Sequence, residues 1–263
     1  MKNLRAVTIS VVALLLSANA QAALIPVAGG LGVYDDVNNV TWASDGNLFA
    51  TQAASYSGGS SAFLAAVIAA SGGVIYDTPN ITDTVPNSGY HTLSASDFYS
   101  QGFMTWWGAK AWANYLNFTN YAGTNTWALP TTVDSNLSFG YPNGGAGDPS
   151  QDSSQMAQLF YGGLGQVANS TITSTHNSSY ALFTNLQSSV YWSGTEYSAS
   201  PSYAWFFYAY GGGQYGYGKG NRGLALAVSP GQISAVPEPS VAWLLGTGFL
   251  GLSGLRRRKA KKP

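Results

Sequence analysis

Few residues in this chain have side chains that could do chemistry. It contains no cysteine, which excludes disulfides, thiol catalysis and cysteine-ligated metals. Its two histidines, His91 and His176, lie in separate polar stretches that we interpret as solvated loops. The spacings typical of serine hydrolases and zinc proteases are absent, and no two carboxylates stand out as the acid pair of a glycoside hydrolase. We therefore predict that the protein is not an enzyme, and an enzyme that modifies envelope polymers is the weakest alternative.

Aromatic residues offer a better route to ligand binding. The stretch Tyr203–Tyr210 is expected to form a strand with aromatic side chains on both faces, so one face must pack inside the protein. The other face is either covered by a loop or forms a binding platform, because tyrosine and tryptophan rings stack on sugar rings while acids bond their hydroxyls. We predict that Trp192 and Trp205 belong to the core. The candidate ligand-binding residues are Glu196, Tyr197, Tyr208, Tyr210, Tyr215 and Tyr217.

Carboxylates in predicted turns could bind calcium, which prefers oxygen ligands. The candidates are Asp35, Asp36, Asp45, Asp134, Asp148 and Asp152. No linear calcium-binding motif is present, so ordinary surface turn residues are the favoured interpretation. We predict no cofactor and keep calcium as an alternative.

The charge of the chain is unevenly distributed. The formal net charge is +0, yet eight of the 11 basic residues lie in the first 22 and the last 28 positions. Residues 23–235 keep three basic and ten acidic residues, a net charge of −7. Nucleic acid is therefore not expected as a partner, because phosphate binding needs clustered Lys and Arg. Polyanionic polymers are disfavoured for the same reason unless a cation bridges the two.

The N-terminal segment has the composition of an export signal. Lys2 and Arg5 precede the apolar stretch Ala6–Leu16, and small residues follow up to Ala22. This order predicts a secretory signal peptide over residues 1–22, which is handled by the Sec machinery and cleaved after Ala22 or Ala20.

The C-terminal segment, residues 236–263, combines a short motif, an apolar run and a basic cluster. The run Val241–Leu255 has 15 residues, about 22 Å as a helix, and is shorter than the ~20 residues of a stable transmembrane helix. Six Lys and Arg residues follow and would stay on the cytoplasmic side of the membrane. The motif consists of Val236, Pro237, Glu238 and Pro239.

This segment resembles the PEP-CTERM sorting signal, which an exosortase-type membrane protease recognises and removes. An ordinary membrane anchor is the alternative. The resemblance implies a Gram-negative bacterium, transient insertion into its inner membrane, and a final location at the cell surface or in the extracellular polysaccharide matrix of a biofilm.

The 213 residues between the two ends are enough for one large domain or two small ones. Periodicity predicts a hairpin over 32–42 and helices over 60–70 and 105–116, with Thr105 as the N-cap of the second helix. A further helix carrying Met156, Leu159 and Phe160 is predicted to follow a capping box of Asp152 and Gln155. Loops are predicted over 76–94, 134–149 and 170–179, and strands over 189–193, 203–210, 214–218 and 223–229.

Several motifs between residues 31 and 231 resemble the Lcl C-terminal domain family, which is named from a collagen-like adhesin. They are Tyr34-Asp35-Asp36 with Thr41-Trp42, Met104-Thr105-Trp106 with Ala111-Trp112, Leu129-Pro130-Thr131, Tyr191-Trp192-Ser193 and Pro230-Gly231. The relation of that family to C-type-lectin-like folds implies an α+β domain over residues 23–235, with two main helices, small antiparallel sheets and long loops. Two arginines that are usual in the family are replaced by Ala128 and Ser229, so any role they have is lost here.

These observations together predict an exported, surface-sorted, non-catalytic protein that binds carbohydrate, with extracellular polysaccharide as the partner. The alternative is a structural protein of the extracellular matrix that self-associates through its Tyr- and Gly-rich strands.

Overall fold

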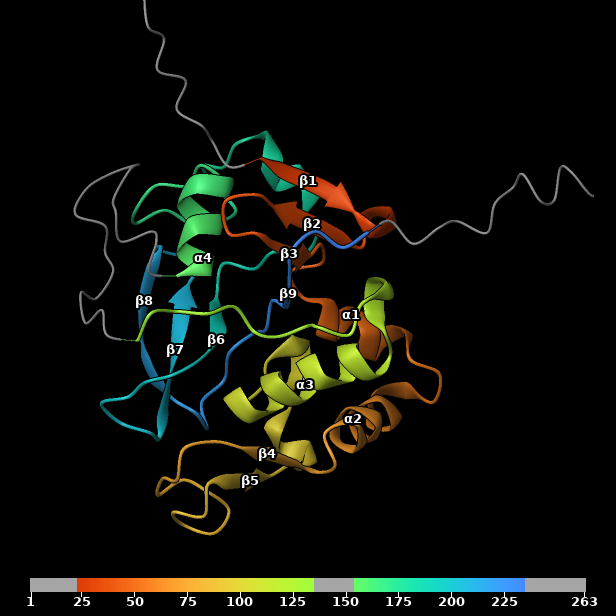
Figure 1. Cartoon of the computed structure of the whole chain (residues 1–263), viewed down its shortest axis with the longest axis vertical. Helices are drawn as coiled ribbons and strands as arrows, with labels where there is room; N and C mark the ends of the chain where they lie inside the picture. The colour runs from red at the N-terminus through yellow and green to blue at the C-terminus, as the bar shows by residue number, and fades with distance from the viewer. Residues whose placement is uncertain (1–22, 135–153, 235–263) are drawn as a thin grey trace, which may run out of the picture.

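The computed structural model describes residues 23–134 and 154–234, and the chain begins there with a four-stranded antiparallel sheet. The strand order is β1-β2-β3-β9, with β1 (Leu24–Val27), β2 (Gly32–Asp35), β3 (Val40–Ala43) and β9 (Val228–Pro230). The hairpin predicted over 32–42 is confirmed as β2 and β3. Because β9 pairs with β3, the first and last strands of the described chain belong to one sheet (Figure 1).

The turn between β2 and β3 is built around the buried carboxylate of Asp35. It accepts hydrogen bonds from the backbone N–H groups of Val37 and Asn38, at 3.1 and 3.0 Å, and from Nδ2 of Asn38 at 2.7 Å. It also accepts a hydrogen bond from Nε1 of Trp42 at 3.2 Å, and neither Asp35 nor Trp42 is exposed to solvent. The neighbouring Asp36 is exposed, and its Oδ1 accepts the backbone N–H of Ala23 at 2.8 Å rather than a group of the turn.

Three helices pack together below this sheet in Figure 1. They are α1 (Leu48–Ser55), α2 (Gly59–Ala70) and α3 (Trp106–Phe118). The helices predicted over 60–70 and 105–116 are confirmed as α2 and α3, and Oγ1 of Thr105 accepts the backbone N–H of Gly108 at 3.1 Å, as an N-cap does. Helix α1 was not predicted, because its only buried residues are Leu48 and Phe49 at its start and no apolar stripe continues from them.

A two-stranded hairpin follows α2, made of β4 (Val74–Tyr76) and β5 (Tyr90–Thr92). The prediction of loop throughout 76–94 was therefore wrong at its ends, where strands of three residues are too short to show alternation. The intervening loop is held by the buried Asp83, which accepts hydrogen bonds from the backbone N–H of Asn80 at 3.0 Å, from Nδ2 of Asn80 at 2.6 Å and from the backbone N–H of Gly89 at 2.7 Å.

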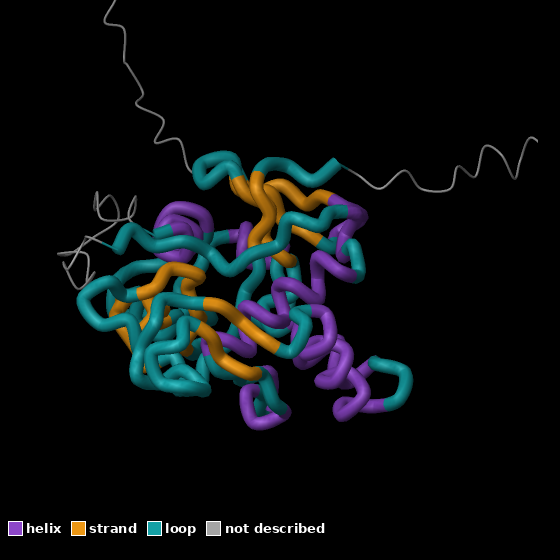
Figure 2. The backbone as a smooth tube through the Cα atoms, turned by 60° about the horizontal axis from the view of Figure 1, so that its bottom comes forward, coloured by secondary structure: helices purple, strands orange, loops and turns teal. Residues whose placement is uncertain are grey.

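The third sheet is an antiparallel meander of β6 (Val190–Glu196), β7 (Tyr203–Tyr208) and β8 (Gly213–Gly218). It lies beside the helical part of the structure (Figures 1 and 2) and contacts it through α3, where Nε1 of Trp106 donates to the carbonyl oxygen of Ser193 in β6 at 2.8 Å. These strands confirm three of the four predicted for this region. The fourth, over 223–229, was wrong, because only residues 228–230 form a strand and they join β3 in the first sheet. A β-bulge interrupts β6 between Trp192 and Glu196.

One face of the meander is covered by α4 (Gln155–Gln158) and the π-helical turn that continues it, Leu159–Gly163. The rings of Phe160 and Phe207 lie 5.4 Å apart across this contact. The helix begins after Ser154, whose Oγ accepts the backbone N–H of Ala157 at 3.2 Å. The predicted cap Asp152 lies outside the described residues, as do Asp148 and most of the predicted loop 134–149.

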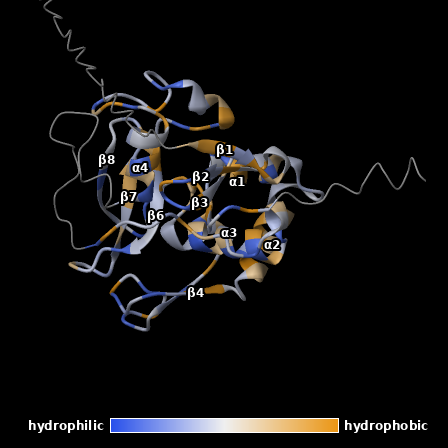
Figure 3. Cartoon of the chain, turned by 45° about the horizontal axis from the view of Figure 1, so that its top comes forward, coloured by the Kyte–Doolittle hydropathy of each residue, from blue (hydrophilic) through white to orange (hydrophobic). Residues whose placement is uncertain are grey.

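The described part of the chain is a mixed α+β structure with small antiparallel sheets, as predicted, although it has more than two helices. Its largest fully buried side chains are mostly aromatic, and hydrophobic residues mark the central strand β7 in Figure 3. Trp192 and Trp205 are both completely buried, which confirms that they pack in the core. Short 3-10 turns occupy Ala28–Gly30, Ala95–Asp97, Ser100–Gly102, Tyr121–Gly123 and Ser178–Leu182.

Candidate functional site

The face of the β6–β7–β8 meander that α4 leaves uncovered carries a row of tyrosines. Strand pairing places Phe206 opposite Tyr215, and Ala204 opposite Tyr217. Side chains of directly paired residues lie on the same face, and alternate residues along a strand share a face, so Phe206, Tyr208, Tyr215 and Tyr217 point the same way. Tyr210 follows the end of β7 and lies against Tyr208, with ring centres 4.5 Å apart.

These residues line an open groove with a volume of about 320 Å³. Phe206 is its floor, since it is only 3% exposed and three tyrosine rings lie around it. The ring centres of Tyr208, Tyr215 and Tyr217 lie 4.7, 6.0 and 4.8 Å from that of Phe206. Such packing fixes the rings while leaving them half-buried, and Tyr210 remains 47% exposed. The structure thus brings together four of the six predicted ligand-binding residues, Tyr208, Tyr210, Tyr215 and Tyr217.

The other two predicted residues, Glu196 and Tyr197, do not line this groove. Tyr197 lies over Gly216 on the opposite face of the sheet, where its ring centre is 5.2 Å from that of Trp205. It is on that face because β8 has glycine at position 216, which leaves room for a ring. Glu196 ends β6 and belongs to a different cluster.

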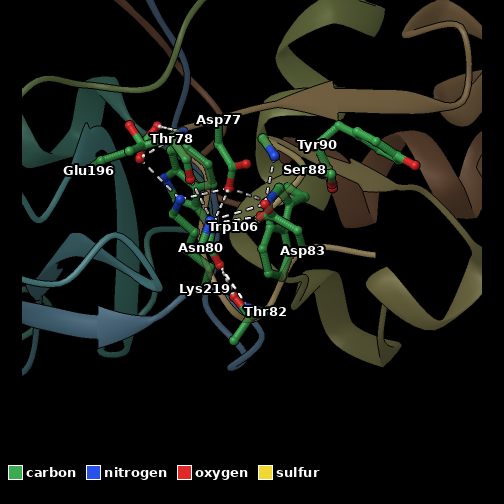
Figure 4. Close-up of polar contacts among 12 residues, drawn as sticks. Asp77, Thr78, Asn80, Thr82, Asp83, Ser88, Tyr90, Trp106, Glu196 and Lys219 are labelled. Carbon is green, nitrogen blue, oxygen red and sulfur yellow. Dashed lines mark hydrogen bonds and ion pairs between the residues drawn. The ribbon is translucent and has the colours of Figure 1, made fainter. Parts of the chain in front are cut away.

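That second cluster is a buried lysine between two carboxylates (Figure 4). Nζ of Lys219 lies 2.7 Å from Oδ2 of Asp77 and 3.1 Å from Oε2 of Glu196. The side chains of Lys219 and Asp77 are completely buried, while that of Glu196 is 25% exposed. Lys219 directly follows β8 and Asp77 directly follows β4, so the ion pairs join the β4–β5 hairpin to the meander.

Tryptophan and a second lysine complete the surroundings of Lys219. Its Nζ lies 4.7 Å from the centre of the Trp106 ring, and the backbone N–H of Trp106 donates to its carbonyl oxygen at 2.9 Å. Nζ of Lys110 lies 4.4 Å from the centre of the same ring. Burial lowers the pKa of Lys110 below its usual value, although the nearby Glu196 and Asp77 act in the opposite direction. Two lysines and two carboxylates are therefore clustered here, of which Lys110 and Glu196 are only partly buried.

The two carboxylates of the cluster have different hydrogen-bond partners. Oδ2 of Asp77 also accepts from Nε1 of Trp107 at 3.0 Å and from Nδ2 of Asn80 at 3.3 Å. Oδ1 of Asp77 is buried and has no hydrogen-bond partner among the described residues. The carboxylate of Glu196 accepts the backbone N–H of Thr78, at 3.2 and 3.3 Å from its two oxygens.

Of the two histidines, His176 is exposed in a loop as predicted, but the prediction was wrong for His91. His91 lies in β5, stacks on Trp107 with ring centres 4.0 Å apart, and places Nε2 2.9 Å from Oδ1 of Asp97. Burial tends to raise the pKa of Asp97, but hydrogen bonds from His91, Ser94 and Thr105 outweigh it and lower that pKa below its usual value. The pair connects β5 to the N-terminus of α3.

The candidate calcium ligands that the structure describes act as hydrogen-bond acceptors within the fold. Asp45 accepts from the backbone N–H of Asn47 at 2.9 Å and from the hydroxyl of Thr51 at 2.6 Å at the start of α1. Asp134 accepts from Nε1 of Trp205 at 2.7 Å. Within residues 23–134 and 154–234, no group of three or more His, Asp and Glu side chains is arranged to hold a metal ion.

The pairing of Lys219 with Asp77 was not predicted from the sequence. The two residues are 142 positions apart, and no local pattern connects them. One signal was available. The body of the chain, residues 23–235, has ten acidic residues and only three basic ones, so a specific acidic partner for Lys219 is expected.

Comparison with known proteins bears on the C-terminal segment. A family model described as the PEP-CTERM protein-sorting motif matches residues 235–259. The chain carries a PEP-CTERM sorting signal. The PEP-CTERM match includes the predicted motif Val236, Pro237, Glu238 and Pro239, and it indicates an exported protein that is recognised by an exosortase and sorted to the cell surface.

No curated protein and no solved structure matches the chain. The resemblance to the Lcl C-terminal domain family and to C-type-lectin-like folds therefore stays a prediction. The structure does place Ala128 and Ser229, where arginines are usual in that family, on adjoining segments, since Ala128 pairs with Val228. In the described part of the chain, no helix has both the length and the apolar character needed to cross a bilayer, and the predicted run Val241–Leu255 lies outside that part.

Proposed function

We propose that this protein is a non-catalytic, surface-sorted module that binds a neutral polysaccharide in the groove formed by Tyr208, Tyr210, Tyr215 and Tyr217. The observation that carries the proposal is that these four tyrosines line one open groove on a single sheet face. Aromatic rings that are fixed from below and partly exposed above can stack on the C–H faces of sugar rings, while their hydroxyl ends bond to sugar hydroxyls.

Charge and location select the class of polymer. The body carries a net charge of −7, which disfavours polyanionic chains. The sorting signal indicates an exported, surface-sorted protein, and the proposal takes extracellular polysaccharide as the neutral polymer that it meets there. The proposal includes transit through the inner membrane of a Gram-negative bacterium and a C-type-lectin-like relationship for the body.

Affinity gel electrophoresis tests the proposal. The full chain is run through gels that contain neutral glucans, galactomannans or the extracellular polysaccharide of the producing organism, with and without a calcium chelator. Retardation by at least one polymer is expected. The absence of retardation in all gels would refute the proposal.

Single substitutions then locate the site. Tyr210→Ala and Tyr215→Ala should each weaken binding by about fivefold or more, because the loss of one stacked ring costs about 1 kcal/mol. The matched control is Tyr76→Ala, since Tyr76 is 75% exposed on β4, outside the groove. Equal losses in the control and in the groove variants would show that the groove is not the binding site.

Self-association is the second candidate function. Strand β8 is at the end of its sheet in the described part of the chain and is rich in glycine, so its outer edge resembles those that pair with other chains. Sedimentation velocity over a hundredfold range of protein concentration separates the two functions. A protein that stays monomeric at the highest concentration would exclude self-association and leave the groove proposal intact.

A further inference from the structure

The Lys219 cluster has the composition and geometry of a site for covalent cross-linking. A primary amine lies 2.7 Å from a carboxylate oxygen, and a second carboxylate lies 3.1 Å from the same amine. We propose that Lys219 and Asp77 form an intramolecular isopeptide bond, with Glu196 as the group that transfers the proton. This inference is independent of ligand binding in the groove.

The reaction balances without any co-reactant. A lysine ammonium and an aspartate carboxylate contain together the atoms of one amide and one water. Glu196 accepts a proton from Nζ of Lys219, and the neutral amine attacks Cγ of Asp77. The Nζ–Cγ bond forms and one Cγ–O bond breaks. The departing oxygen takes up the two protons that Nζ has lost and leaves as water, and Glu196 returns the last of these protons.

The hydrogen bonds of Asp77 suit this reaction. Nε1 of Trp107 and Nδ2 of Asn80 donate to Oδ2, where negative charge builds up when the amine attacks. Donors that are already in place at such an oxygen stabilise the tetrahedral intermediate. Oδ1, the oxygen that must depart, has no hydrogen-bond partner among the described residues.

Burial favours the product over the ion pair. The side chains of Lys219 and Asp77 are completely shielded from solvent, and the ring of Trp106 lies 4.7 Å from Nζ of Lys219. A buried ion pair loses the hydration of both charges, whereas an amide carries no charge and so avoids that penalty. Exclusion of water also protects the bond from hydrolysis. Fixed contact between the two groups replaces a bimolecular encounter, which is how proximity accelerates such reactions.

The cross-link would serve the protein in the role that disulfides have in other exported proteins. The chain has no cysteine and is sorted to the cell surface. A bond between Asp77 and Lys219 would connect residues 142 positions apart and would fix the β4–β5 hairpin to the meander that carries the tyrosine groove.

Peptide mass spectrometry tests the proposal directly. Trypsin cuts after Lys and Arg, and residues 23–235 contain only Lys110, Lys219 and Arg222. The folded full chain is purified, denatured and digested. If the bond exists, trypsin no longer cleaves after Lys219, and the peptide ending at Lys110 remains joined to residues 111–222. The mass of the joined species is then lower by one water than the sum of the two separate peptides. Separate peptides of unmodified mass from folded protein would overturn the proposal.

Two variants assign the roles. Lys219→Arg keeps the positive charge and the trypsin site but lacks the amine nucleophile, so its peptides should separate. Glu196→Gln keeps the size of the side chain and should leave Lys219 and Asp77 uncoupled, or slow the coupling by at least about a hundredfold. A Glu196→Gln protein that cross-links at the normal rate would exclude Glu196 as the proton-transfer group, and the wild-type mass decides the bond itself even if a variant fails to fold.

Discussion

The Asp35 turn gives the sharpest test of how this fold is held together. Asp35→Ala removes a carboxylate that accepts four hydrogen bonds and leaves Nε1 of Trp42 buried without an acceptor. An unsatisfied buried donor costs about 1–3 kcal/mol, and the loss of bonds to the turn amides adds about 1 kcal/mol, since water replaces the carboxylate there. We expect the free energy of unfolding to fall by about 3 kcal/mol, a large part of the stability of an ordinary domain.

Urea unfolding of the full chain, followed by tryptophan fluorescence, measures this loss. The matched control is Asp36→Ala, which alters the adjacent exposed acid and should cost less than about 0.5 kcal/mol. Trp42→Phe removes the donor but keeps a ring, so the double variant should be less destabilised than the sum of the two single variants. Equal effects at Asp35 and Asp36, or strict additivity with Trp42→Phe, would refute the role assigned to the buried carboxylate.

Two further predictions concern other parts of the fold. Hydrogen bonds hold the pKa of Asp97 below its ordinary value of 3.8, so its contribution to stability is complete above that pH and is lost as the pH falls through the lower folded value. Asp97→Asn should therefore flatten the loss of unfolding free energy below about pH 4, and an unchanged acid limb in urea titrations would contradict this. Gly102→Ala should destabilise the protein by about 2 kcal/mol, because Gly102 has φ +88° and its new Cβ would overlap Oδ1 of Asn47. Gly220→Ala, where a Cβ meets no atom within 4 Å, should be nearly neutral when both variants are compared by urea unfolding.

Local sequence patterns are sufficient to predict those helices and hairpins whose structure depends mainly on their own residues. The helix over 105–116 is predictable because Thr105 is a strong N-cap and Trp112 and Leu116 repeat at helical spacing. The hairpin over 32–42 is predictable because turn residues separate two short β-branched and aromatic runs. In the same way, alternation along Tyr203–Tyr210 predicts that Phe206 and Tyr208 share a face, and the pairing of β7 with β8 confirms it.

Non-local packing determines the features that local patterns do not predict. The strand predicted over 223–229 has the right composition, but its C-terminal part pairs with β3, about 190 positions earlier, and its start adds only an isolated bridge from Leu224 to Tyr191 of β6. Glu196 is conspicuous as the only Glu of residues 23–235. Its partners could not be predicted, because Lys219 follows β8 and Asp77 follows β4, and only the folded chain brings the two strand ends together. His91 resembles a loop residue in the sequence because its strand has three residues, and its role depends on contacts with Asp97 and Trp107.

The position of β9 has a consequence for the order of events during export. The first sheet cannot be completed until residues 228–230 have crossed the membrane to meet β3, and the matched sorting motif begins at residue 235, only a few positions later. At no more than about 3.6 Å per residue, five residues reach less than about 20 Å. Completion of the first sheet and presentation of the sorting motif therefore depend on neighbouring stretches of chain, and cleavage within the motif would leave β9 on the released protein.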